Sequence, residues 1–206
     1  MAAAKANKIQ FGLKNVHLAV ITETADETTG KVTYDYGTPK ALPGAVSLAR
    51  DINGSSDDEY ADDGVWVQLY NDNGYDGDLE LEILPDWFYT DVMNWKKDKN
   101  GIIHEDPNVA PNKFALLYEF TNDVKSRRMV DYYCSMNRPG RNGETKQDKI
   151  SPQHSTITIA SRPRQDGATH AFSSMDVNET IYNTWYEKVY EKPEETTDTS
   201  SSGTKG

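Results

Sequence analysis

Two glutamates near the middle of the sequence have a spacing that glycoside hydrolysis could use. Glu80 and Glu82 alternate with apolar residues along an expected strand, so both carboxylates face the same side of it. Most glycosidases act through a pair of carboxyl groups that flank the scissile bond. Any alternating acidic strand produces the same arrangement, so the spacing alone does not indicate catalysis.

A second candidate is a calcium loop at residues 72–77, which begin with the acidic and glycine positions of an EF-hand. Its third position would be Gly74 and its twelfth Ile83, so two ligands, including the bidentate carboxylate, are missing. The four histidines, which are His17, His104, His154 and His170, have no partner at metal-ligand spacing. We therefore expect no metal, no cofactor and no catalytic residue.

The single cysteine, Cys134, cannot form an intramolecular disulfide. It follows the apolar pair Tyr132 and Tyr133, which predicts a buried and unreactive thiol. The sequence contains no phosphate-binding loop, dinucleotide fingerprint or nucleophile elbow. These observations favour a chain that is not an enzyme.

The stretch from residue 64 to residue 94 predicts two strands and a short helix. Residues 65–70 favour a strand, and residues 71–77 hold Asn-Gly and Asp-Gly pairs that predict a turn. Residues 78–84 alternate, which places one set of side chains in the core and Glu80 and Glu82 on the opposite face. The expected core residues, which include two from a helix at residues 87–93, are Leu79, Leu81, Ile83, Trp87 and Phe88.

The rest of the chain predicts further short strands and one more helix. Strands are expected at residues 16–21, 31–36, 46–52, 101–103, 113–120, 126–136, 155–161 and 167–172, and the helix at residues 178–191. Residues 137–154 read as a long polar loop, and residues 192–206 are too polar to order themselves. The expected fold is therefore mainly β: an antiparallel β-sandwich or open barrel with one packed helix.

Several short motifs together resemble one family. They are residues 7–17 (NKIQFGLKNVH), 36–40 (YGTPK), 43–47 (PGAVS), 60–62 (YAD), 73–75 (NGY) and 77–80 (GDLE). In this order and spacing, over about residues 7–190, they resemble the major tail proteins of long-tailed, non-contractile bacteriophages. The resemblance implies a tail-tube β-sandwich domain at residues 1–191, followed by the tail at residues 192–206.

The same resemblance implies a structural protein of the virion. Such subunits form hexameric rings that stack into a tube, with β-sheets joined edge to edge around a lumen that Glu80 and Glu82 could face. The implied partners are other copies of the chain, a tape measure protein in the lumen, and tail terminator and distal tail proteins at the ends. DNA would pass through during ejection without specific binding, and no cofactor or membrane would be involved.

Charge supports this hypothesis in two ways. The net charge of −11 argues against phosphate neutralisation by the protein, and no signal peptide or membrane span is evident, so we expect assembly in a host cytoplasm. Residues 51–63 carry six acids and no base, whereas residues 125–149 carry seven basic and three acidic residues, a balance of +4. We expect opposite charges to join successive rings through Arg138, Arg141 and Lys146 on one side and Asp57, Asp58 and Glu59 on the other.

Two other functions stay open at this point. Twelve tyrosines and four tryptophans could line a carbohydrate-binding face on a β-sandwich module, instead of filling a core or an assembly interface. A glycoside hydrolase would instead require a pocket that holds Glu80 and Glu82.

Overall fold

The computed structural model describes residues 6–141, 143, 145 and 152–193. Its elements are β1 (Gln10–Ala25), β2 (Val32–Tyr36), β3 (Lys40–Ala41), β4 (Ala45–Leu48), β5 (Asp51–Ala61), β6 (Gly64–Leu81), the π-helical turn η1 (Phe88–Val92), β7 (Lys96–Lys97), β8 (Ile103–His104), β9 (Phe114–Asn122), β10 (Arg127–Met136), β11 (Ser155–Ser161), β12 (His170–Phe172) and α1 (Glu179–Asn183). The expected antiparallel, mainly β fold is confirmed.

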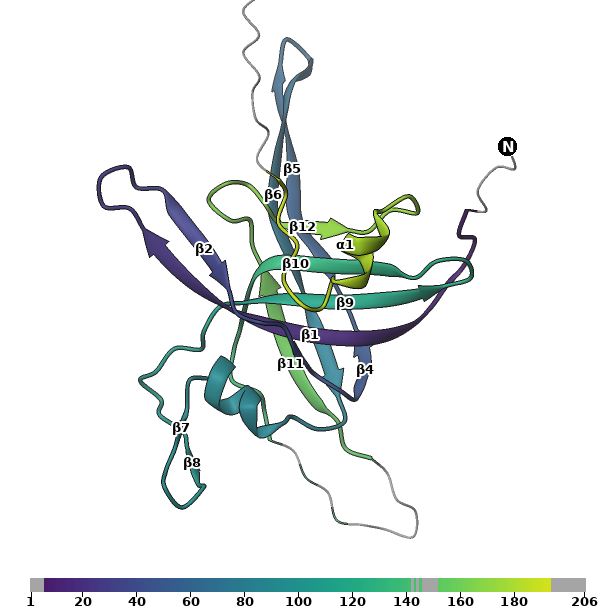
Figure 1. The fold of residues 1–206 in the computed structure, drawn as a ribbon. Coiled ribbons are helices and arrows are strands. Elements are labelled where there is room, and N and C mark those ends of the chain that lie inside the picture. Colours follow the sequence, from purple (N-terminus) through teal and green to yellow (C-terminus); the bar gives the residue numbers. More distant parts are fainter. Residues whose placement is uncertain (1–5, 142, 144, 146–151, 194–206) are drawn as a thin grey trace, which may run out of the picture.

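Ten strands form one strongly bent sheet whose main path runs β2-β1-β9-β10-β11-β6-β4. The bend brings β4 back beside β1, so the sheet encloses a core like an open barrel (Figure 1). Inward-facing residues alternate along the strands, as expected for Phe114, Leu116 and Tyr118 of β9. The turn η1 adds the fully buried Phe88 to the same core.

A second, smaller core lies on the outer face of the sheet. Trp185 and Val189 from the C-terminal segment pack there against Ala115, Leu117 and Val130. The expected helix at residues 178–191 is correct only at its start, where the Asn178 side chain accepts the Thr180 N–H at 2.8 Å. The helix ends at Asn183, and the residues after it form turns that hold Trp185 and Val189 on the sheet.

The turn expected at residues 71–77 is wrong, because β6 runs without interruption through this segment. The reversal occurs instead at Asp62 and Asp63, whose φ angles are 51° and 62°. Gly74 and Gly77 serve a different purpose: β6 passes so close to the carbonyl oxygens of Ser161 and Ala49 that neither position has space for a Cβ.

The acidic stretch at residues 51–63 lies almost entirely in the sheet. Most of it forms β5, which pairs with β6 from Asp51 opposite Asp76 out to Ala61 opposite Gly64. Backbone pairing with the β-branched and aromatic residues of β6 holds this stretch extended although its own side chains are mostly polar.

Alternation correctly predicted Leu79 and Leu81, which are fully buried, but not Ile83, which is 72% exposed. The strand ends at Leu81, so the two-residue period stops there and Leu84 enters the core instead. Of the two expected core aromatics near η1, Phe88 is buried and Trp87 is half-buried against the same cluster.

We predict that Gly77→Ala lowers the free energy of unfolding by about 1–3 kcal/mol, because the new methyl group would collide with the Ala49 carbonyl. Urea unfolding followed by circular dichroism measures the loss. Gly64→Ala is the control, because nothing lies within 4 Å of a Cβ at that position. Equal stability of the two variants would contradict this account of β6.

Candidate assembly surface

The outer part of the β5–β6 hairpin projects from the barrel as a two-stranded arm, which we define as residues 54–72 (Figure 1). Every residue of the arm is exposed. Among the described elements, β5 packs extensively against β6 alone. A hairpin of two strands is at best marginally stable in water without a further packing surface, so the arm is a candidate for contact with a partner.

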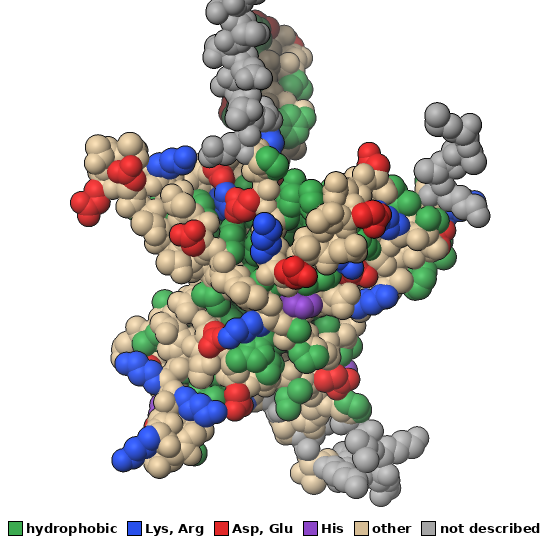
Figure 2. All heavy atoms as spheres, viewed as in Figure 1, with side chains coloured by type: hydrophobic (Ala, Val, Ile, Leu, Met, Phe, Trp, Pro, Cys, Tyr) green, Lys and Arg blue, Asp and Glu red, His purple; other side chains and the backbone are tan. Residues whose placement is uncertain are grey.

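The arm combines apolar and acidic side chains. Trp66 is 72% exposed, and the other large exposed residues are Tyr60, Val65, Val67, Leu69 and Tyr70. Figure 2 shows apolar groups on the visible side of the projection at the top. Asp57, Asp58, Glu59, Asp62 and Asp63 surround its outer end, and residues 51–94 contain no lysine, arginine or histidine. Exposed apolar surface of this kind makes the arm a candidate interaction site.

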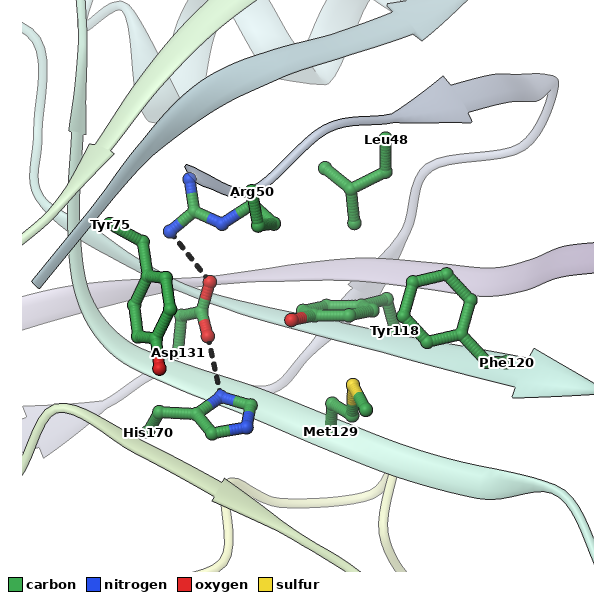
Figure 3. A pocket seen from close by; sticks show the side chains of 8 residues that line it. All are labelled: Leu48, Arg50, Tyr75, Tyr118, Phe120, Met129, Asp131 and His170. Carbon is green, nitrogen blue, oxygen red and sulfur yellow. Dashed lines mark hydrogen bonds and ion pairs between the residues drawn. The ribbon is translucent and has the colours of Figure 1, made fainter. Parts of the chain in front are cut away.

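The base of the arm borders a cavity of about 330 Å³ at one end of the barrel, which we call the barrel mouth. Leu48, Phe120 and Met129 form its apolar wall, and the rings of Tyr75 and Tyr118 lie beside them (Figure 3). Burial, aided by the nearby Asp131 carboxylate, raises the pKa of Tyr118, so its hydroxyl stays protonated.

The polar wall of the barrel mouth is a cluster of Arg50, Asp131 and His170, in which Arg50 and Asp131 form a buried ion pair (Figure 3). Arg50 Nη2 lies 2.7 Å from Asp131 Oδ2, and the two side chains are 8% and 1% exposed. His170 Nδ1 lies 2.8 Å from the other oxygen of Asp131. Asp131 therefore neutralises Arg50 and orients the imidazole.

Some polar atoms of this cluster make hydrogen bonds and others do not. Arg50 Nη1 donates to the Ile159 carbonyl at 3.1 Å. Within the described part of the chain, Arg50 Nε has no hydrogen-bond partner, and Asp131 Oδ2 is placed for an ion pair but not aligned for a hydrogen bond. Both atoms are shielded from solvent, so a group that enters the mouth would meet the two tyrosines and His170 of its lining before these atoms.

Glu80 and Glu82 lie outside the core, as expected, and flank His154, whose Nδ1 is 3.0 Å from Glu80 and whose Nε2 is 3.5 Å from Glu82. Hydrogen bonds from His154 and Ser47 lower the pKa of Glu80. The general acid of a glycosidase needs a raised pKa instead, so this environment does not favour the hydrolase hypothesis.

The residues expected to join rings are far apart in the subunit. Asp57, Asp58 and Glu59 lie on the arm, whereas Arg138 and Arg141 both contact Glu105, at 2.5 and 3.4 Å. Glu105 directly follows β8, which lies at the opposite end of the subunit from the arm (Figure 1). Lys146 and residues 194–206 of the expected tail lie outside the described residues. The charge-mediated stacking of rings stays a prediction.

The barrel-mouth cluster was not predicted from the sequence, because Arg50, Asp131 and His170 come from three distant segments. One signal was available: Asp131 is a lone carboxylate within the apolar run of β10. Among the described residues, no group of three or more histidine, cysteine or acidic side chains could hold a metal ion, and no helix is long and apolar enough to cross a membrane.

No protein-family model matches the chain, and no curated protein matches it.

We predict that Asp131→Asn costs about 3–5 kcal/mol of stability, because it leaves the buried Arg50 charge without a counter-ion. The matched control is Asp86→Asn, which removes an exposed carboxylate 3.5 Å from Lys97 and should cost at most about 1 kcal/mol. Denaturant unfolding of both variants gives the comparison. Similar costs for the two would show that the buried pair has little effect on stability.

We also predict that Cys134 reacts with an aromatic disulfide reagent only as fast as the protein unfolds. The thiol is fully buried, and burial raises its pKa to about 12, so almost no thiolate exists at neutral pH. Absorbance of the released thiol, measured in buffer and in denaturant, tests this. Rapid reaction of the folded protein would refute it.

Proposed function

We propose that the chain is a structural subunit that assembles with copies of itself into the tail tube of a long-tailed bacteriophage. The observation that carries the proposal is the arm, whose exposed apolar residues lack any packing surface within the described subunit. A lone subunit would gain nothing from such a projection, whereas an assembly can bury it.

The sheet supports the proposal through its free edges. Along the arm, β5 pairs only with β6, and no other strand joins β6 there in the described residues. Unpaired edges are templates for strands of another chain, and closure into a ring removes them. The sequence resemblance adds the arrangement: hexameric rings stacked into a tube in the virion tail.

The acidic character fits the proposed passage of DNA. A subunit with a net charge of −11 would repel DNA instead of binding it, so DNA could move through the lumen during ejection. A tape measure protein inside the tube, and terminator and distal tail proteins at its ends, are the further partners that this proposal includes.

One observation favours a second function, carbohydrate binding by a monomer. The barrel mouth places the Tyr75 and Tyr118 rings beside buried hydrogen-bonding groups, a combination that also suits a sugar. A glycan array would identify this activity, and a monomer that binds a defined glycan would favour it over the tail tube.

Electron microscopy and sedimentation velocity test the main proposal. We predict that the purified chain forms rings or tubes and that a shortened variant, in which Asn-Gly joins Ser56 directly to Tyr70, remains monomeric. Ser56 and Tyr70 are paired across the hairpin, so a two-residue turn can connect them without disturbing the barrel.

An unchanged near-ultraviolet circular dichroism spectrum would be the folding control for the shortened variant. Unaltered assembly after shortening would remove the arm from the interface. A full-length chain that stays monomeric at all concentrations would contradict the proposed function.

A further inference from the structure

The arm exposes aromatic side chains, and the barrel mouth is a cavity with apolar and polar walls, but the two cannot meet within one subunit. Arg50 precedes β5 and Tyr75 lies in β6, so the mouth sits at the base of the arm. Pairing from Gly54–Asp72 to Ala61–Gly64, with one register shift after Glu59, holds the arm extended. At about 3.3 Å per residue, its outer end lies roughly 25 Å from the base.

Trp66 is the arm residue best placed to act as an anchor. Glu59 pairs with Val67 and Tyr60 pairs with Val65, so Trp66 is the extra residue of a β-bulge near the outer end. Bulges redirect side chains out of the regular pleat. Tryptophan is also among the residues most enriched at the energetic centres of interfaces, where it fills a pocket on the partner.

The barrel mouth suits an indole chemically. Its volume of about 330 Å³ is sufficient for one such side chain. Leu48, Phe120 and Met129 would contact the rings, and the hydroxyl of Tyr118, which lines the same cavity, could accept the indole N–H that a buried tryptophan needs to satisfy.

Charge around the mouth complements the arm. The Arg127 guanidinium lies over the Phe172 ring at 4.9 Å, and that ring is 5.8 Å from His170, which lines the cavity. Arg127 has no ion-pair partner among the residues that the structure describes. It can therefore attract the carboxylates that surround Trp66.

We propose that Trp66 of one subunit inserts into the barrel mouth of a second copy of the chain. This inference rests on the proposed self-assembly and names its contact surfaces. Because the arm and the mouth are different surfaces, the contact is heterologous, and its repetition produces either a closed ring or an open filament.

Two complementary variants test the contact. Trp66→Ala removes the anchor, and Met129→Trp fills the mouth with a side chain of the subunit itself. We expect each variant alone to self-associate at least about 30-fold more weakly than the unaltered chain, as loss of a central interface anchor should. Sedimentation velocity over a concentration series gives the ratio.

Mixing the variants gives a sharper result. The intact arm of Met129→Trp can enter the intact mouth of Trp66→Ala, but the resulting pair has no second competent contact. We therefore expect one-to-one dimers that do not grow. Tyr70→Ala is the matched control, because Tyr70 is as exposed as Trp66 but lies outside the bulge, and it should assemble normally.

The outcomes separate this inference from the proposed function. If the unaltered chain and Trp66→Ala assemble equally, the anchor is wrong while the tail-tube proposal stands. If only Met129→Trp fails, although folded, the mouth binds another group and the assignment of Trp66 is wrong. A monomeric unaltered chain overturns both. Since Trp66 is exposed, its replacement leaves the core intact and is decisive even if Met129→Trp does not fold.

Discussion

The open end of the barrel depends on the contacts that the buried carboxylate of Asp131 makes. Asp131 lies on β10 and binds Arg50, which precedes β5, and His170, which begins β12. In the described part of the chain no ladder of hydrogen bonds joins β4 to β1, so the sheet does not close by backbone pairing alone. Because an unpaired buried charge is costly, Arg50 and Asp131 hold the two sides of the opening together.

The same pair fixes the direction of the arm. Arg50 is followed immediately by β5, so its attachment to β10 anchors the base of the hairpin. Asp76, opposite Asp51, adds contacts to Asn53 at 2.5 Å and Arg162 at 2.6 Å, and the Arg162 hydrogen bond lowers its pKa. The arm therefore leaves the barrel from a rigid base, which reduces the entropy that a partner would have to remove on binding.

The alternation of neighbouring residues correctly predicted those strands in which one face is buried and the other is exposed. Alternation identified β9, β10 and β11 and the burial of Leu79 and Leu81, because inward and outward faces differ in polarity there. The turn predicted at residues 71–77 from Asn-Gly and Asp-Gly pairs was wrong, since such pairs permit either a turn or a close approach between strands. The Arg50–Asp131–His170 cluster could not be predicted, because only the curled sheet brings these distant residues together.

The composition of the arm reflects two opposing requirements. A hairpin that exposes Trp66 and Tyr70 invites association with any apolar surface, including wrong strands of other copies. The carboxylates around its outer end oppose such contacts, because like charges repel between arms. A docking surface must then supply both an apolar cavity and compensating positive charge, which is a stricter condition than hydrophobicity alone. In the proposed contact, the barrel mouth supplies the cavity, and Arg127, stacked on the Phe172 ring next to His170, supplies positive charge, so acidity around the arm would favour this contact over aggregation.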